Sequence, residues 1–186
     1  ILKGMEIVYV SREKYREMRT YDHPCSSFPK YKNFNFIPEG GSNQLGVEGC
    51  KQIAQFIPAE YTHILLAVGT GATLKGLARQ VEKHQNIIGI KVREARQEEY
   101  IFQSGEAKVN DSIILNADFT FGGYARKSTF LEDFVGKWNE NQKIAIEPIY
   151  TGRLFYAVQH LLQQNYFPKS AKIMVIHSGG LQYFDH

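Results

Sequence analysis

The sequence of 186 residues has few cysteines, no long apolar run and no strong charge of one sign. Only Cys25 and Cys50 occur, and their spacing fits neither a CxxC pair nor a zinc site, which predicts a reduced, cytoplasmic protein. No run of eighteen apolar residues exists, so we expect no membrane-spanning helix and no membrane partner. The net charge is +3, and the basic residues are scattered, which gives no indication of a nucleic-acid partner.

Metal-binding patterns and two common nucleotide-binding motifs are also missing. The six histidines are dispersed, with no HxxxH or HxH pair, so we expect no metal site. No glycine precedes a Lys-Ser or Lys-Thr pair, which excludes a P-loop. Leu74 stands where the dinucleotide fingerprint GxGxxG needs its third glycine. ATP hydrolysis and ordinary NAD binding are therefore disfavoured.

What the sequence does contain is a regular alternation of apolar and amphipathic segments. The apolar segments predict strands at 6–10, 63–68, 87–92, 112–116 and 172–180. The amphipathic segments predict helices at 45–56, 73–83, 94–104, 128–141 and 152–167. Apolar strands separated by helices are typical of an α/β fold with a twisted, mostly parallel sheet and helices on both faces.

One glycine-rich bend joins a predicted strand directly to a predicted helix. It comprises Gly69, Thr70, Gly71, Ala72 and Thr73. Glycines let the backbone approach an anion closely, and the first turn of a helix offers N–H groups without helical partners. The bend therefore predicts a phosphate site, although a tight strand-to-helix turn without a ligand has the same sequence.

Five segments together resemble the signature blocks of the 1-aminocyclopropane-1-carboxylate deaminase and D-cysteine desulfhydrase family, in the same order along the chain. They are PEGGSNQLGVEGC (38–50), AVGTGATLKGL (67–77), FGGYARKS (121–128), EPIYTGRLFYAV (147–158) and IHSGGLQ (176–182). This resemblance implies a tryptophan-synthase-β-like fold (fold type II) and pyridoxal 5'-phosphate as cofactor. It also implies a small amino acid as substrate, and a homodimer.

The resemblance assigns a role to each site residue that it covers. It implies that Gly69, Thr70, Gly71, Ala72 and Thr73 bind the cofactor phosphate, that Thr151 and Ser178 lie near the ring nitrogen, and that Tyr124 and Tyr150 face the substrate as catalytic groups. Each has a structural alternative, because a lone tyrosine is more often a half-buried core residue and a serine after a strand can cap a turn. His177 is interpreted as structural.

One departure from the family pattern bears on the reaction. The deaminases that the chain resembles have Glu directly after the tyrosine, whereas this chain has Thr151. A hydroxyl leaves the ring nitrogen of the cofactor closer to neutral than a carboxylate does, which suits proton removal and loss of a β-leaving group. The resemblance thus favours a D-cysteine type of elimination, to a 2-oxo acid and ammonia, over opening of a cyclopropane ring.

The family's Schiff-base lysine is missing from the chain. None of the fourteen lysines stands in the family's setting for that residue. We therefore expect a C-terminal fragment that is inactive alone, with residues 1–35 as the remnant of the small domain and connecting loop, and 36–186 as the C-terminal part of the large cofactor-binding domain. The alternative is a noncatalytic α/β domain that binds a phosphorylated metabolite through the same loop.

Overall fold

The computed structural model describes residues 4, 6–18, 24–92, 113–123, 126 and 128–180. The chain divides into two units, Ile1–Pro38 and Glu39–His186. The predicted helix at 94–104 lies outside the described residues.

The first unit contains short helices: α1 (Arg12–Met18), η1 (Pro24–Ser27) and η2 (Pro29–Tyr31). The predicted strand at 6–10 is wrong, because these residues form no strand and the Tyr9 side chain is 90% exposed. A strand needs a neighbour to accept and donate its backbone hydrogen bonds, and the described part of this unit contains no other strand. β-propensity alone did not suffice.

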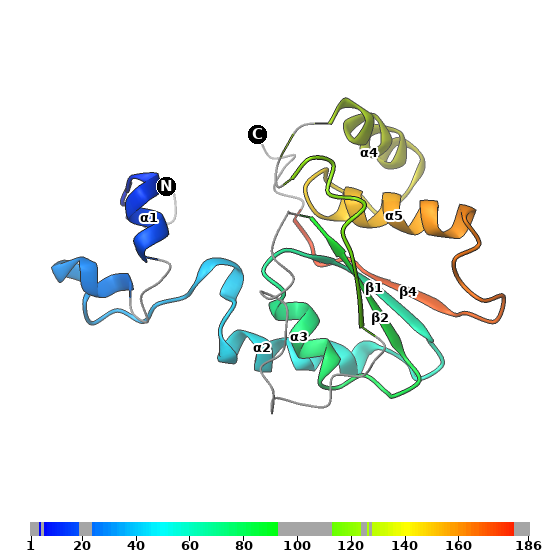
Figure 1. Cartoon of the computed structure of the whole chain (residues 1–186), viewed down its shortest axis with the longest axis horizontal. Coiled ribbons are helices and arrows are strands. Elements are labelled where there is room, and N and C mark those ends of the chain that lie inside the picture. Colours follow the sequence, from blue (N-terminus) through cyan, green and yellow to red (C-terminus); the bar gives the residue numbers. More distant parts are fainter. Residues whose placement is uncertain are drawn as a thin grey trace. The chain divides into compact units, whose positions relative to one another are not determined.

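The second unit is built on a four-stranded parallel sheet (Figure 1). Its strands are β1 (His63–Val68), β2 (Asn86–Lys91), β3 (Ile113–Asn116) and β4 (Ile173–Ile176), in the spatial order β3-β2-β1-β4. β1 lies between β2 and β4, so that Leu65 is paired with Ile88 on one side and with Val175 on the other. The predicted parallel sheet is confirmed.

Helices cover both faces of this sheet, as predicted (Figure 1). The helical elements of the second unit are η3 (Glu39–Gly41), α2 (Gln44–Lys51), η4 (Gln52–Phe56), α3 (Ala72–Ala78), α4 (Thr129–Asn141) and α5 (Thr151–Gln163). α2 and α3 lie against one face, and α4 and α5 lie on the other (Figure 1).

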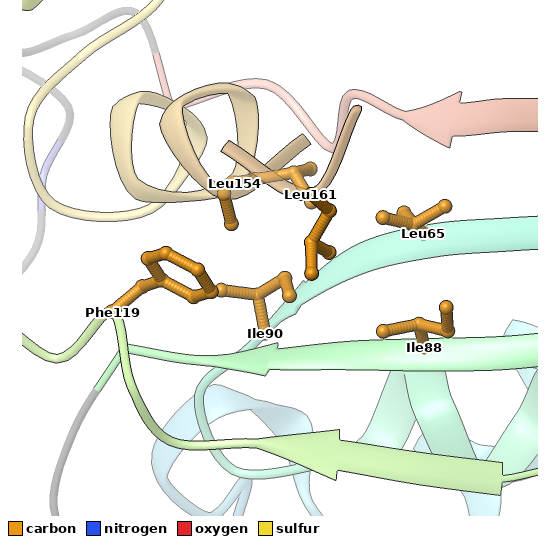
Figure 2. Close-up of a cluster of buried hydrophobic side chains, with 7 residues drawn as sticks. Leu65, Ile88, Ile90, Phe119, Leu154 and Leu161 are labelled. Carbon is orange, nitrogen blue, oxygen red and sulfur yellow. The ribbon is translucent and has the colours of Figure 1, made fainter. Parts of the chain in front are cut away.

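The apolar core is divided between the two faces because successive strand residues point in opposite directions. Leu65, Ile88 and Ile90 contact Leu154 and Leu161 of α5, as Figure 2 shows. On the opposite face the buried cluster comprises Leu66, Val68, Leu74, Leu77, Ala78 and Ile87. β1 and β2 are therefore apolar on both sides, which explains their nearly continuous apolar sequences.

Gly76 of α3 and Gly136 of α4 differ in the space around them, which gives a test of the packing. A Cβ at Gly76 would lie 2.7 Å from the carbonyl oxygen of Val47 and 2.5 Å from Cβ of Cys50, whereas a Cβ at Gly136 would meet no atom within 4 Å. We expect Gly76→Ala to lower the free energy of unfolding by about 1–3 kcal/mol, because α2 and α3 must separate. Gly136→Ala should raise it by about 0.5–1 kcal/mol, through helix propensity. Urea denaturation of both variants checks this, and equal effects would contradict the packing described.

Candidate functional site

A cavity of about 350 Å³ lies at the carboxyl ends of β1 and β4. Gly69 directly follows β1, Ser178 comes shortly after β4, and Tyr150 directly precedes α5. The cavity is lined by Glu39, Gly40, Ala67, Val68, Gly69, Thr70, Gly71, Ala72, Thr73, Leu74, Tyr150 and Ser178. β1 and β4 are spatial neighbours although α3 and α5, on opposite faces, separate them along the chain. Such a position in an open α/β sheet is the common place for a ligand.

The glycine-rich bend forms one wall of the cavity and begins α3. Gly71 adopts a left-handed conformation with φ of 89°, which favours glycine, and it is the N-cap residue of α3. No side chain caps this helix. By contrast, Asn43 caps α2 and Ser128 caps α4 through side-chain oxygens that accept backbone N–H groups. The start of α3 thus presents its first N–H groups without a side-chain acceptor, beside a cavity.

Two close approaches shape the cavity: glycine makes room for both, and one of them requires it. A Cβ at Gly69 would lie 3.1 Å from Cε1 of Tyr150, so the tyrosine ring rests against the backbone of the bend. A Cβ at Gly40, whose φ is 63°, would lie 2.6 Å from Oγ1 of Thr70. The segment 39–50 and the bend, separated in sequence, therefore fit together through Gly40.

The structure separates the two hydroxyls that were expected to share a role. Ser178 is exposed and lines the cavity, and no hydrogen-bond partner of its hydroxyl is found in the part of the chain that the structure describes. Thr151 is 1% exposed and is not among the lining residues. Its Oγ1 accepts the backbone N–H of Glu147 at 2.8 Å and donates to Oε1 of Glu147 at 3.1 Å. Of these two residues, only Ser178 lines the cavity.

Glu147 was missed by the sequence reasoning. Its side chain is 1% exposed, and its carboxylate accepts the backbone N–H groups of Ile149 at 2.6 Å, Tyr150 at 2.8 Å and Thr151 at 2.7 Å. The carboxylate therefore caps α5 and compensates the positive end of its helix dipole. The available signal was an acidic residue shortly before a strongly amphipathic helix.

Arg153 is a second buried charged residue that the sequence reasoning did not single out. Its side chain is fully buried, and its guanidinium donates to the carbonyl oxygens of Val92 and Gly123, the latter at 2.9 Å. Burial lowers the pKa of Arg153, while the nearby charge of Glu147 opposes that change. Arg153 thus joins α5 to the end of β2 and to the loop after β3.

His177 has a structural role, in agreement with its interpretation from sequence. Its Nδ1 accepts the backbone N–H of Gly179 at 3.2 Å, so Nε2 carries the hydrogen and donates to the carbonyl oxygen of Ala145 at 2.8 Å. The pair of bonds fixes the turn that carries Ser178. Tyr124, the other predicted catalytic residue, lies outside the described residues.

The described part of the chain lacks three kinds of feature. No lysine is among the described residues that line the cavity. Within the described ranges, no three His, Cys, Asp or Glu side chains are grouped as a metal site would need. None of the described helices combines the length and apolar character needed to cross a membrane.

Similar proteins were found by sequence, although no protein-family model matches the chain. A Thermotoga maritima protein named "Putative 1-aminocyclopropane-1-carboxylate deaminase" is 26% identical over 97% of this chain. The Arabidopsis thaliana protein named "Bifunctional D-cysteine desulfhydrase/1-aminocyclopropane-1-carboxylate deaminase, mitochondrial" is 28% identical over 78% of the chain. A Klebsiella pneumoniae D-cysteine desulfhydrase is 26% identical over 77%. The predicted resemblance to this family is confirmed.

The same comparisons show how much of each relative the chain spans. It covers 63% of the Thermotoga maritima protein, 41% of the Arabidopsis thaliana protein and 49% of the Klebsiella pneumoniae protein. A crystal structure described as an ACC deaminase homologue superposes with a TM-score of 0.75 at 23% identity, over 97% of this chain and 60% of that one. This superposition confirms the predicted fold.

The different environments of Thr151 and Ser178 generate a stability test. Thr151→Val leaves the N–H of Glu147 without its hydroxyl acceptor in a buried setting, so we expect a loss of about 1–3 kcal/mol in the free energy of unfolding. Ser178→Ala removes an exposed hydroxyl and should change that free energy by less than about 0.5 kcal/mol. Thermal or urea unfolding measures both, and a large loss for Ser178→Ala would contradict the placement of its hydroxyl.

Proposed function

We propose that this chain forms the phosphate-binding part of a pyridoxal 5'-phosphate enzyme that eliminates a β-leaving group from a small amino acid. One observation carries the proposal: residues to which the resemblance assigns contacts with the cofactor or the substrate come from three separate segments, and these segments line one cavity, although Thr151 does not line it. The segments are the bend after β1, Tyr150 before α5, and Ser178 after β4. The names of the similar proteins support the class of reaction.

The residues present fit the cofactor. The cavity volume of about 350 Å³ is in the range of small-molecule sites. A phosphate would accept from the N–H groups of the bend and of the uncapped start of α3, and Thr70 and Thr73 line the same cavity. Gly71 lets the backbone turn into this arrangement.

When bound, pyridoxal phosphate supplies an electron sink for the bond that is broken at the amino-acid substrate. Tyr150 packs against Gly69 and would orient the ring, and its phenolic oxygen could hold or deliver a proton at the substrate. Tyr124 is proposed for the same kind of role. Ser178 is the better candidate for the ring nitrogen, because Thr151 already donates its proton to Glu147. A hydroxyl at that place favours elimination of the D-cysteine type.

We further propose that the lysine that binds the cofactor covalently is not contributed by these 186 residues, so that this polypeptide alone is inactive. The lack of a lysine among the described residues that line the cavity supports this. On this proposal residues 1–35 derive from the small domain, and 36–186 from the large one. The enzyme as a whole would be a cytoplasmic homodimer.

Reduction of a mixture of the chain and pyridoxal phosphate with borohydride tests the proposal. We expect pyridoxal phosphate to bind reversibly and inorganic phosphate to compete with it. Intact mass and peptide mapping should show no stoichiometric adduct on one lysine. The chain should not turn over D-cysteine. Ser178→Ala should weaken the affinity by up to about tenfold, the scale of one hydrogen bond.

Two results would contradict the proposed function. A stoichiometric adduct on one lysine, with turnover of D-cysteine, would show that a complete site exists in this chain. Binding of a sugar phosphate without any binding of pyridoxal phosphate would instead favour a noncatalytic phosphate-metabolite domain.

A further inference from the structure

The carboxylate of Glu147 is buried and receives more hydrogen bonds than a helix cap needs. Three consecutive backbone N–H groups donate to it, and the hydroxyl of Thr151 adds a fourth donor at 3.1 Å. A simple N-cap side chain satisfies one N–H group of a helix. Glu147 therefore fixes the whole turn from Ile149 to Thr151, and not only the first peptide of α5.

This turn carries Tyr150, which forms one wall of the cavity. The backbone N–H of Tyr150 donates to Oε1 of Glu147 at 2.8 Å. Its ring lies against Gly69 so closely that a Cβ there would be 3.1 Å from Cε1. A shift of the turn by a few tenths of an ångström would therefore move the ring relative to the glycine-rich bend.

Glu147 also lies beside the third segment of the site. Gly180, with φ of 92°, follows Ser178 by two residues, and a Cβ at Gly180 would lie 3.6 Å from Cγ and 3.7 Å from Oε1 of Glu147, at ordinary van der Waals distance. The left-handed backbone of Gly180 favours glycine at this place. The same side chain thus holds the turn of Tyr150 and borders the segment of Ser178.

The first turn of α5 also carries a buried cation near Glu147. Arg153 is fully buried, and burial lowers its pKa while the nearby charge of Glu147 opposes that change. Its guanidinium donates to two backbone carbonyl oxygens, those of Val92 and Gly123.

We propose that Glu147 is a positioning residue that sets the distance between the Tyr150 wall and the glycine-rich bend, and so determines how well the cavity accepts the ring of the cofactor. The ligand part of this inference rests on the function proposed above. Glu147 itself lies outside the lining of the cavity and acts through Tyr150 and the segment of Ser178.

The variant Glu147→Gln tests this inference, with Glu140→Gln as the matched control on an exposed site of α4. We expect Glu147→Gln to speed hydrogen exchange of the amides of Ile149, Tyr150 and Thr151, and to weaken pyridoxal phosphate binding by about tenfold or more. The affinity for inorganic phosphate, which the bend alone would hold, should change by less than about twofold. Glu140→Gln should change none of these.

A double-mutant cycle with Tyr150→Ala separates positioning from loss of stability. If Glu147 acts through the Tyr150 wall, Glu147→Gln in the Tyr150→Ala background should lower pyridoxal phosphate affinity much less than in the wild-type background. An equal additional loss in both backgrounds, or an equal loss of phosphate affinity, would overturn the inference.

A milder variant covers the case in which Glu147→Gln fails to fold. Glu147→Asp keeps the charge but draws the carboxylate back by one methylene, so it should show faster exchange at Tyr150 and an intermediate loss of pyridoxal phosphate affinity. Wild-type exchange protection and affinity in this variant would contradict the inference. Absence of pyridoxal phosphate binding by the wild-type chain would contradict the proposed function instead, while the exchange measurement would still test the role of Glu147.

Discussion

β1 pairs with β2 on one side and with β4 on the other, and this pairing determines where the helices of the second unit and the cavity lie. Because β1 is central, its residues are buried by helices from both faces, and its carboxyl end is held next to that of β4. The bend after β1 and the turn after β4 therefore lie side by side. α5 packs on Leu65 and brings Tyr150 to the same place. The cavity is thus a consequence of strand order.

Much of this fold could be predicted from periodicity, because β1 and β2 are long enough and apolar enough to be recognised. The strand predicted at 63–68 has those bounds in the structure. The helix predicted at 73–83 ends at Ala78, because the chain turns there toward β2. Val81 extended the apolar pattern of the sequence, but it lies in that turn. The prediction of a strand at 6–10 was wrong because the sequence of a segment does not show whether another strand lies beside it to pair with.

Less of the candidate site than of the fold could be predicted from the sequence. Order of motifs along the chain identified the bend, Tyr150 and Ser178, and the structure brings these together. It could not distinguish Thr151 from Ser178, because the direction of each hydroxyl depends on a turn formed around Glu147. Glu147 and Arg153 were overlooked because a buried charge is recognised by its partners, and these partners are backbone groups whose positions follow from the folded turn and not from residue type.

We propose that the cavity between the bend, Tyr150 and Ser178 holds the phosphate and ring of pyridoxal phosphate. Titration of the isotope-labelled chain with pyridoxal phosphate, followed by amide chemical shifts, distinguishes this binding mode from binding elsewhere on the chain. We expect saturable shifts at Gly69 to Thr73, Tyr150 and Ser178, with inorganic phosphate reproducing only those of the bend. Saturable shifts confined to another surface, or no shifts at the bend, would contradict it.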